Sequence, residues 1–265
     1  MKKIFLATAI AALSISAAQA YQVELNGNLS YDSIDIPGGS SEIFGVGVGG
    51  TYYLNQVSGK TGPLAEAAFI ERASNVNASY GYAQNNDFDT KANNVNVGGE
   101  FYVPNSDFYA AASIGRDYTK VKGLKQVGET NYTAEVGLLP ITNLLVAVGI
   151  AGVDSHGNND TDATIRAKYL TKLANNNDVN LEGHAQFGNN SNHYGVSGDY
   201  YLDRTLSIGA SYDLTTIDHA DDDYSFGVNA RKFIAQNISV QGGVNVGKVF
   251  NRDTFGLAVG GTYRF

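Results

Sequence analysis

The stretch YYLDRTLSIGASYDL, from Tyr200 to Leu214, decides the fold. Between residues 206 and 214 the even positions are apolar or aromatic, and the odd positions are small or polar. A period of two is typical of a β-strand with one apolar face and one polar face. The short segment Asp203–Thr205, which follows an apolar strand end, predicts a hairpin turn ahead of this strand.

The same sequence pattern, an apolar strand end followed by a short turn and an apolar strand start, recurs along the chain. Similar patterns lie near residues 52–55, 101–110, 138–150 and 232–240. Longer polar segments separate them, around residues 36–41, 85–93, 123–128, 154–162, 188–192, 218–222 and 251–253. Such a repeat predicts an up-and-down antiparallel meander. Short turns alternating with longer polar loops are typical of outer-membrane barrels, with turns in the periplasm and loops outside.

This pattern predicts an all-β, transmembrane, up-and-down β-barrel of about 14 strands. The expected strands are 22–33, 43–54, 65–83, 93–103, 107–121, 128–139, 143–153, 162–171, 178–188, 193–202, 206–217, 223–233, 237–249 and 254–265. An even number places both ends of the barrel chain on the periplasmic side. The range 65–83 is too long for one simple span, so we expect a bulge or an inward bend there.

The two faces of the strands favour a membrane barrel over a soluble β-sandwich, which also alternates apolar and polar residues. In strand 178–188, for example, Val179, Leu181 and Phe187 oppose Glu182 and His184. Aromatic residues gather near strand ends, as in the interfacial girdles of such barrels. The proposed girdle residues are Tyr52, Tyr80, Tyr82, Phe101, Tyr169, Tyr194, Tyr200, Tyr224, Tyr263 and Phe265.

The N-terminal stretch MKKIFLATAIAALSISAAQA has the order of parts of a secretory signal. Two lysines precede a short apolar run, and Ala18-Gln19-Ala20 fits the small-x-small cleavage rule. We therefore expect cleavage between Ala20 and Tyr21, a signal peptide over 1–20 and a single barrel domain over 21–265.

Composition supports this class of protein and excludes others. The chain has 26 acidic and 18 basic residues, a net charge of −8 that argues against nucleic acid as a partner. It has no cysteine, hence no disulfide and no cysteine metal site. With 31 glycines, 17 tyrosines and 4 prolines, the composition fits twisted β-sheet better than disorder.

The final strand ends in Tyr263 and Phe265. An amphipathic last strand that ends in Phe resembles the assembly signal of bacterial outer-membrane barrels. We therefore expect the barrel-assembly machinery to be a partner during biogenesis. A girdle role for Phe265 is compatible with this interpretation.

Several phrases resemble the small "putative porin" family of Gram-negative outer-membrane channels. They are YQVELNG at 21–27, GTYYLNQV at 50–57, GPLAEAAFIERAS at 62–74, LLVAVGI at 144–150 and RTLSIGASY at 204–212. The resemblance covers most of the chain after the signal, although the external loops are shorter than the family leads us to expect. It implies a monomeric channel for water and small polar solutes, set among outer-membrane lipids and lipopolysaccharide.

Most ionisable groups of the strands share the parity opposite to the apolar face. The candidates for the pore lining are Glu24, Asp32, Glu100, Glu135, Arg166, Lys168, Glu182, His184, Asp199, Asp213, Arg231 and Arg264. Charges facing lipid near the midplane would each cost about 2–4 kcal/mol, so their parity predicts a wet lumen. The carboxylates outnumber the basic groups, which predicts a preference for cations. The alternatives are an interior filled by salt bridges and a closed structural or adhesive barrel that acts through its external loops.

We expect no enzymatic activity, no cofactor and no metal centre. Asp218-His219 and the acidic run after it occupy a place where barrel proteases hold catalytic pairs, but no second carboxylate pair can be identified. The segment 158–162 loosely resembles a calcium loop, yet it lacks the glycine and the distant glutamate.

Closure of the barrel makes a specific prediction about its ends. A closed barrel has no free edge, so strand 254–265 must pair with strand 22–33 in antiparallel orientation. Glu24 and Arg264 both have inward parity. We therefore expect them to meet at the periplasmic rim of the lumen.

Overall fold

A computed structural model describes residues 20–155 and 158–265. In these residues fourteen antiparallel strands close into one barrel, with each strand paired to its neighbours in sequence. The strands are β1 (Tyr21–Ile36), β2 (Gly39–Val57), β3 (Asn75–Asn85), β4 (Thr90–Tyr102), β5 (Phe108–Val121), β6 (Val127–Ile141), β7 (Leu144–Ser155), β8 (Asn158–Lys172), β9 (Asp178–Phe187), β10 (Ser191–Asp203), β11 (Leu206–Ile217), β12 (Asp223–Ala235), β13 (Ile238–Val249) and β14 (Arg252–Arg264). The predicted strand number, orientation and closure are confirmed.

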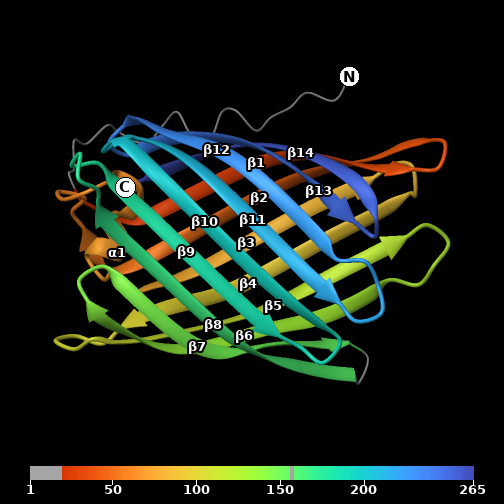
Figure 1. The fold of residues 1–265 in the computed structure, drawn as a ribbon, viewed down its shortest axis with the longest axis horizontal. Coiled ribbons are helices and arrows are strands. Elements are labelled where there is room, and N and C mark those ends of the chain that lie inside the picture. The colour runs from red at the N-terminus through yellow and green to blue at the C-terminus, as the bar shows by residue number, and fades with distance from the viewer. Residues whose placement is uncertain (1–19, 156–157) are drawn as a thin grey trace.

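Two short helical turns interrupt the meander between β2 and β3. They are the 3-10 turn η1 (Leu64–Glu66) and the helix α1 (Ala67–Ile70), which lies at the same end of the barrel as the C-terminus (Figure 1). The expectation of a strand over 65–83 was therefore wrong for its first half, because β3 begins only at Asn75. Neither of these turns, nor any other helix in residues 20–155 and 158–265, could span a lipid bilayer.

The seam between the first and last strands has the predicted register. Glu24 pairs with Arg264, Leu25 with Tyr263 and Asn26 with Thr262. Beyond Glu24, Val23 and Phe265 exchange backbone hydrogen bonds, with N–O distances of 2.9 and 3.0 Å. The barrel therefore has no free strand edge along this seam.

The alternation of side chains follows the register around the barrel. The large apolar residues that are exposed to the surroundings, such as Leu29, Val196 and Val259, share one face of their strands. Polar residues of the opposite parity line the inside of the cylinder. Glycines often oppose them, as where Asn28 pairs with Gly47 and an added Cβ would come within 2.4 Å of the Asn28 side-chain oxygen.

The expected contrast between short turns and longer external loops was wrong in its detail. Only two residues separate β1 from β2 and two separate β13 from β14, because the strand ladders extend into segments expected to be loops. Likewise, the segment 158–162 is the start of β8 and not a polar loop. The longest connection in the described chain is on the periplasmic side, over residues 58–74.

Candidate functional site

The interior of the barrel brings together all the residues that the sequence placed on the inward face. The register joins them in rows across neighbouring strands: Arg166 pairs with His184, and Lys168 pairs with Glu182. Asp199 lies beside Asn180, and Asp213 beside Gly195. The remaining members with this inward parity are Glu24, Asp32, Glu100, Glu135, Arg231 and Arg264. A shared face makes them candidates for the lining of a channel.

Segment 58–74 crosses this interior at the periplasmic end. It leaves the wall between β2 and β3, yet it contacts strands on the other side of the barrel. Leu64 N donates to the Arg204 carbonyl at 2.8 Å, and Arg204 in turn donates to the carbonyls of Gly59 and Gly62 at 2.6 and 2.8 Å. Polar interactions with the far wall therefore hold the segment across the mouth.

Glu66 is the main charged anchor of this segment. Its side chain is buried, accepts a hydrogen bond from the Tyr201 hydroxyl at 2.7 Å and pairs with Lys168 at 2.8 Å. Lys168 also pairs with Glu182 at 2.8 Å and lies 4.9 Å from the Phe69 ring centroid. The one buried ammonium group thus has two carboxylate partners, and buried charges require such pairing.

An apolar layer forms around Phe69 of α1. The inward side chains that pack with it come from the periplasmic halves of six strands: Tyr102, Tyr109, Leu139, Leu145, Leu170 and Tyr201. This half of the lumen is therefore filled by side chains and not only lined by polar groups. These strand ends have apolar or aromatic residues on both faces, so alternation predicted neither this layer nor the helix that it contacts.

A second polar cluster lies next to this layer. Arg166 forms an ion pair with Glu135, and its guanidinium also donates to the Tyr109 hydroxyl at 2.9 Å. The same hydroxyl donates to Glu135 at 3.1 Å. This cluster joins β5, β6 and β8 on the inside of the wall.

Arg264 connects the seam of the barrel to the crossing segment. Its Nε donates to Glu24 at 2.6 Å, which confirms the contact predicted from closure. Its Nη1 donates to the Leu64 carbonyl at 2.8 Å, and its guanidinium lies 4.7 Å from the ring centroids of both Tyr21 and Phe233. This arginine is buried, so it does not face an open channel in this structure.

Open space remains along the rest of the inner wall. One cavity of 540 Å³ is bordered by Asn26, Asn28, Ser79, Asn94 and Asp117. A second, of 380 Å³, is bordered by Glu100, Ser113, Glu135, Arg166 and His184. A third, of 440 Å³, is bordered by Asp32, Asp213, Asp223, Ser225 and Asn245. The polar groups among these linings can contact water and ions.

The structure also shows inward residues that the sequence interpretation missed. Glu66 was missed because its segment was expected to be a strand. His193 was missed although it has the parity of Asp199 on the same strand; it lies close to His184 and Asp213. Parity alone was the signal that could have identified it.

The structure describes only part of the predicted processing and assembly signals. Residues 1–19 lie outside the described part of the chain, so cleavage after Ala20 stays a prediction. Tyr21 begins β1. Tyr263 and Phe265 form an outward aromatic pair, with ring centroids 5.6 Å apart. Their role as an assembly signal also stays a prediction.

Comparison with solved structures identifies similar barrels. The outer membrane protein Omp33 of Acinetobacter baumannii matches with a TM-score of 0.70 and 26% identity over 94% of this chain and 100% of that chain. The Ralstonia pickettii toluene transporter TbuX matches with a TM-score of 0.59 and 9% identity over 92% of this chain and 90% of that one. The CymD monoaromatic hydrocarbon channel has a TM-score of 0.58 and 7% identity, over 92% and 89%. These last two show similarity of fold only.

No curated protein sequence matches this chain. A family model described as "Putative general bacterial porin" matches residues 1–263. That range covers nearly all of the sequence, and the fold similarity to outer-membrane barrels agrees with it. The chain therefore belongs to this family of general bacterial porins, and it is a β-barrel protein of the outer membrane.

Proposed function

We propose that this porin forms a water-filled channel for passive diffusion of water and small polar solutes, with a preference for cations. The observation that supports it best is the division of the wall into two faces. Apolar side chains are exposed on the outside, while polar and charged residues border the interior cavities. Buried ionisable groups of a membrane protein commonly mark ion or solute pathways.

The preference for cations follows from how the lumen charges pair. Three of the four predicted basic groups are engaged with carboxylates: Arg264 with Glu24, Arg166 with Glu135, and Lys168 with Glu66 and Glu182. Within residues 20–155 and 158–265, no salt bridge involves Asp32, Glu100 or Asp199. Carboxylates without a cationic partner give the lumen a negative potential, which favours cations.

The competing function is a closed structural barrel, and segment 58–74 is the observation that favours it. Its buried side chains occupy the periplasmic mouth, and a solute that leaves there must pass beside it or displace it. We infer that this segment sets the narrowest part of the path. The proposal also includes a monomer without enzymatic activity.

Conductance measurements in planar lipid bilayers distinguish an open channel from a closed structural barrel. Purified protein should produce stepwise currents in KCl, and proteoliposomes should swell in small sugars. If well-folded protein at high concentration produces neither current nor swelling, the result would support the closed barrel and contradict the channel.

Selectivity is tested by reversal potentials in a salt gradient. The triple variant Asp32→Asn, Glu100→Gln, Asp199→Asn should shift the reversal potential toward that of a non-selective pore. The control is the triple variant Asp218→Asn, Asp221→Asn, Asp222→Asn, which removes the same number of negative charges from exposed residues of the turn between β11 and β12. An anion preference in the wild-type protein would contradict the assignment and would point to the basic residues as the dominant charges.

A further inference from the structure

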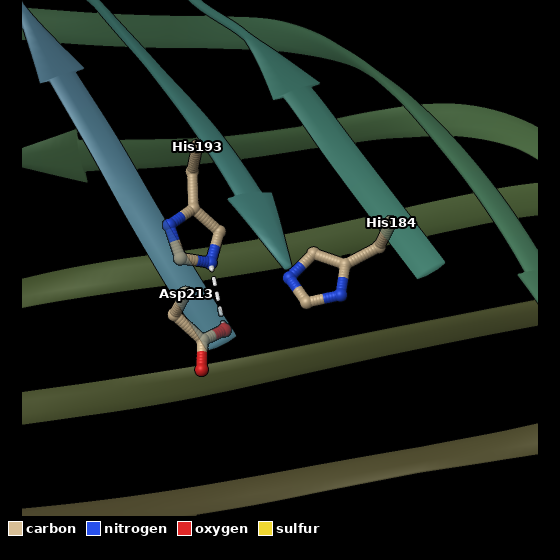
Figure 2. A group of neighbouring side chains, drawn as sticks. All are labelled: His184, His193 and Asp213. Carbon is tan, nitrogen blue, oxygen red and sulfur yellow. Dashed lines mark ion pairs between the residues drawn. The ribbon is translucent and has the colours of Figure 1, made fainter. Parts of the chain in front are cut away.

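Two imidazoles and a carboxylate converge on the inner wall toward its external end. His184 of β9, His193 of β10 and Asp213 of β11 lie on three neighbouring strands, and their side chains approach one another (Figure 2). Each offers one atom that can bind a metal, and these atoms all lie within 4.8 Å of one another. None of the three has a role in the contacts that hold segment 58–74.

The strand register explains why they meet. Gly195 of β10 pairs with His184 on one side and with Asp213 on the other. A Cβ at Gly195 would come within 2.1 Å of His184 Cε1 and 2.7 Å of Asp213 Oδ1. The glycine therefore leaves open the space into which the side chains of His184 and Asp213 extend. His193, two residues earlier on the same face of β10, extends toward the same space.

His193 already has a partner that can orient it. Its Nδ1 lies 3.1 Å from the Thr215 hydroxyl, and its Nε2 lies 3.8 Å from Asp213 Oδ1. When Nδ1 carries the proton and donates to Thr215, Nε2 keeps its lone pair and faces the carboxylate. Metal-binding histidines commonly donate a hydrogen bond from the ring nitrogen that does not bind the metal.

We propose that His184, His193 and Asp213 form a binding site for a divalent transition-metal ion, with Zn²⁺ as the reference ion. Imidazole nitrogens favour Zn²⁺, Cu²⁺ and Ni²⁺, whereas Mg²⁺ and Ca²⁺ prefer sites made of oxygen alone. With metal–ligand bonds of about 2.0–2.2 Å, tetrahedral ligands lie roughly 3.3 Å apart. The ligand atoms must therefore approach by about 1.5 Å at most, which rotation of the exposed His184 side chain can supply. Lumen water completes the coordination.

Bound metal would alter permeation if the barrel conducts ions, and this part of the inference rests on the proposed function. Asp213 also borders the cavity that contains Asp32 and Asp223. A divalent cation there would offset nearby negative charge in the lumen. Micromolar Zn²⁺ should then reduce potassium current in the wild-type protein.

The binding test does not depend on conduction. Folded protein in detergent, prepared without a histidine tag, is titrated with ZnCl₂ by isothermal calorimetry in the presence of excess MgCl₂. The site variants are His184→Ala, His193→Ala, Asp213→Asn and Gly195→Ala, the last of which retains all three ligands. The matched control is His219→Asn, which removes a histidine from an external turn and keeps a residue that tolerates its φ of +63°.

We expect one Zn²⁺ per wild-type chain and at least about a tenfold weakening in each site variant, the loss that removal of supporting groups alone often causes. His219→Asn should bind like wild type. Heat-modifiable migration identifies variants that fold, and any one folded ligand variant suffices for the comparison. The proposal is overturned if wild-type protein shows no saturable Zn²⁺ binding, or if folded His184→Ala or His193→Ala protein binds as tightly as wild type. Zinc binding without any effect on current would contradict only the link to permeation.

Discussion

Weakening the contacts that hold segment 58–74 across the lumen tests whether this segment limits the current through the channel. The change Glu66→Ala removes a buried carboxylate that binds the Tyr201 hydroxyl at 2.7 Å and Lys168 at 2.8 Å. Lys168 keeps Glu182 as a partner, so its charge does not remain uncompensated. The variant therefore loses a part of the docking free energy and not the fold of the barrel wall.

The size of the effect follows from these contacts. A hydrogen bond to a charged group contributes about 1.5–3 kcal/mol, and the pairing of Lys168 with Glu182 limits the total loss to about 2–3 kcal/mol. Because 1.4 kcal/mol is a tenfold change in an equilibrium constant, the ratio of displaced to docked segment should rise about 30- to 140-fold. Arg204 and Arg264 still hold the segment through its carbonyls, so displacement should remain transient.

Single-channel recording in KCl measures this ratio as the frequency of large-conductance events. The control is Lys60→Ala, which removes a charge from an exposed position of the same segment and should leave the frequency unchanged. If folded Glu66→Ala protein shows the same event frequency and conductance as this control, the segment does not limit the current, and the reasoning is refuted.

Three further outcomes test the barrel itself. Cysteines at positions 24 and 264 should form a disulfide in the inserted protein, because this non-hydrogen-bonded pair brings Cα atoms to about 4.5 Å; failure of oxidised protein to cross-link on a denaturing gel would contradict the seam. Deletion of Phe265 should lower the heat-modifiable, membrane-inserted fraction in cells, and normal insertion would show that this residue is not an assembly signal. Leu257→Lys on the lipid face should destabilise the folded barrel in urea titrations by about 2–4 kcal/mol, whereas Ala258→Lys on the lumen face should cost less. Equal losses would argue against the assignment of faces.

Much of the wall could be predicted from alternation alone. The expected strand 206–217 matches β11, and the inward parity of all twelve proposed lining residues agrees with the register. In a strand that separates lipid from water, apolar residues face the lipid and polar residues face the water, so the polarity of each residue indicates the side that it faces. Strand ends were less predictable, because beyond the membrane both faces of a hairpin meet water. The alternation is then lost although the ladder continues.

The segment 58–74 could not be placed from periodicity. Its alanines and its apolar residues fit a strand as well as a helix over a few positions, and a four-residue helix is too short to show a period of its own. Burial against Tyr201, Leu145 and Leu170 decides its conformation, and these residues come from strands far along the chain.

The sequence by itself determined the barrel, the two faces of the alternating parts of its strands and the pairing of Glu24 with Arg264. The period of two can be read within each strand, and an even number of strands brings the first and last strands together in antiparallel orientation. Only the tertiary structure decided which inward groups meet. Glu66 reaches Lys168 across the lumen, and His193 joins His184 and Asp213 over Gly195. Such contacts depend on how strands are registered around a closed cylinder and on a segment that leaves the wall. Parity fixes the side of the wall that a residue faces, but not the residue that it meets there.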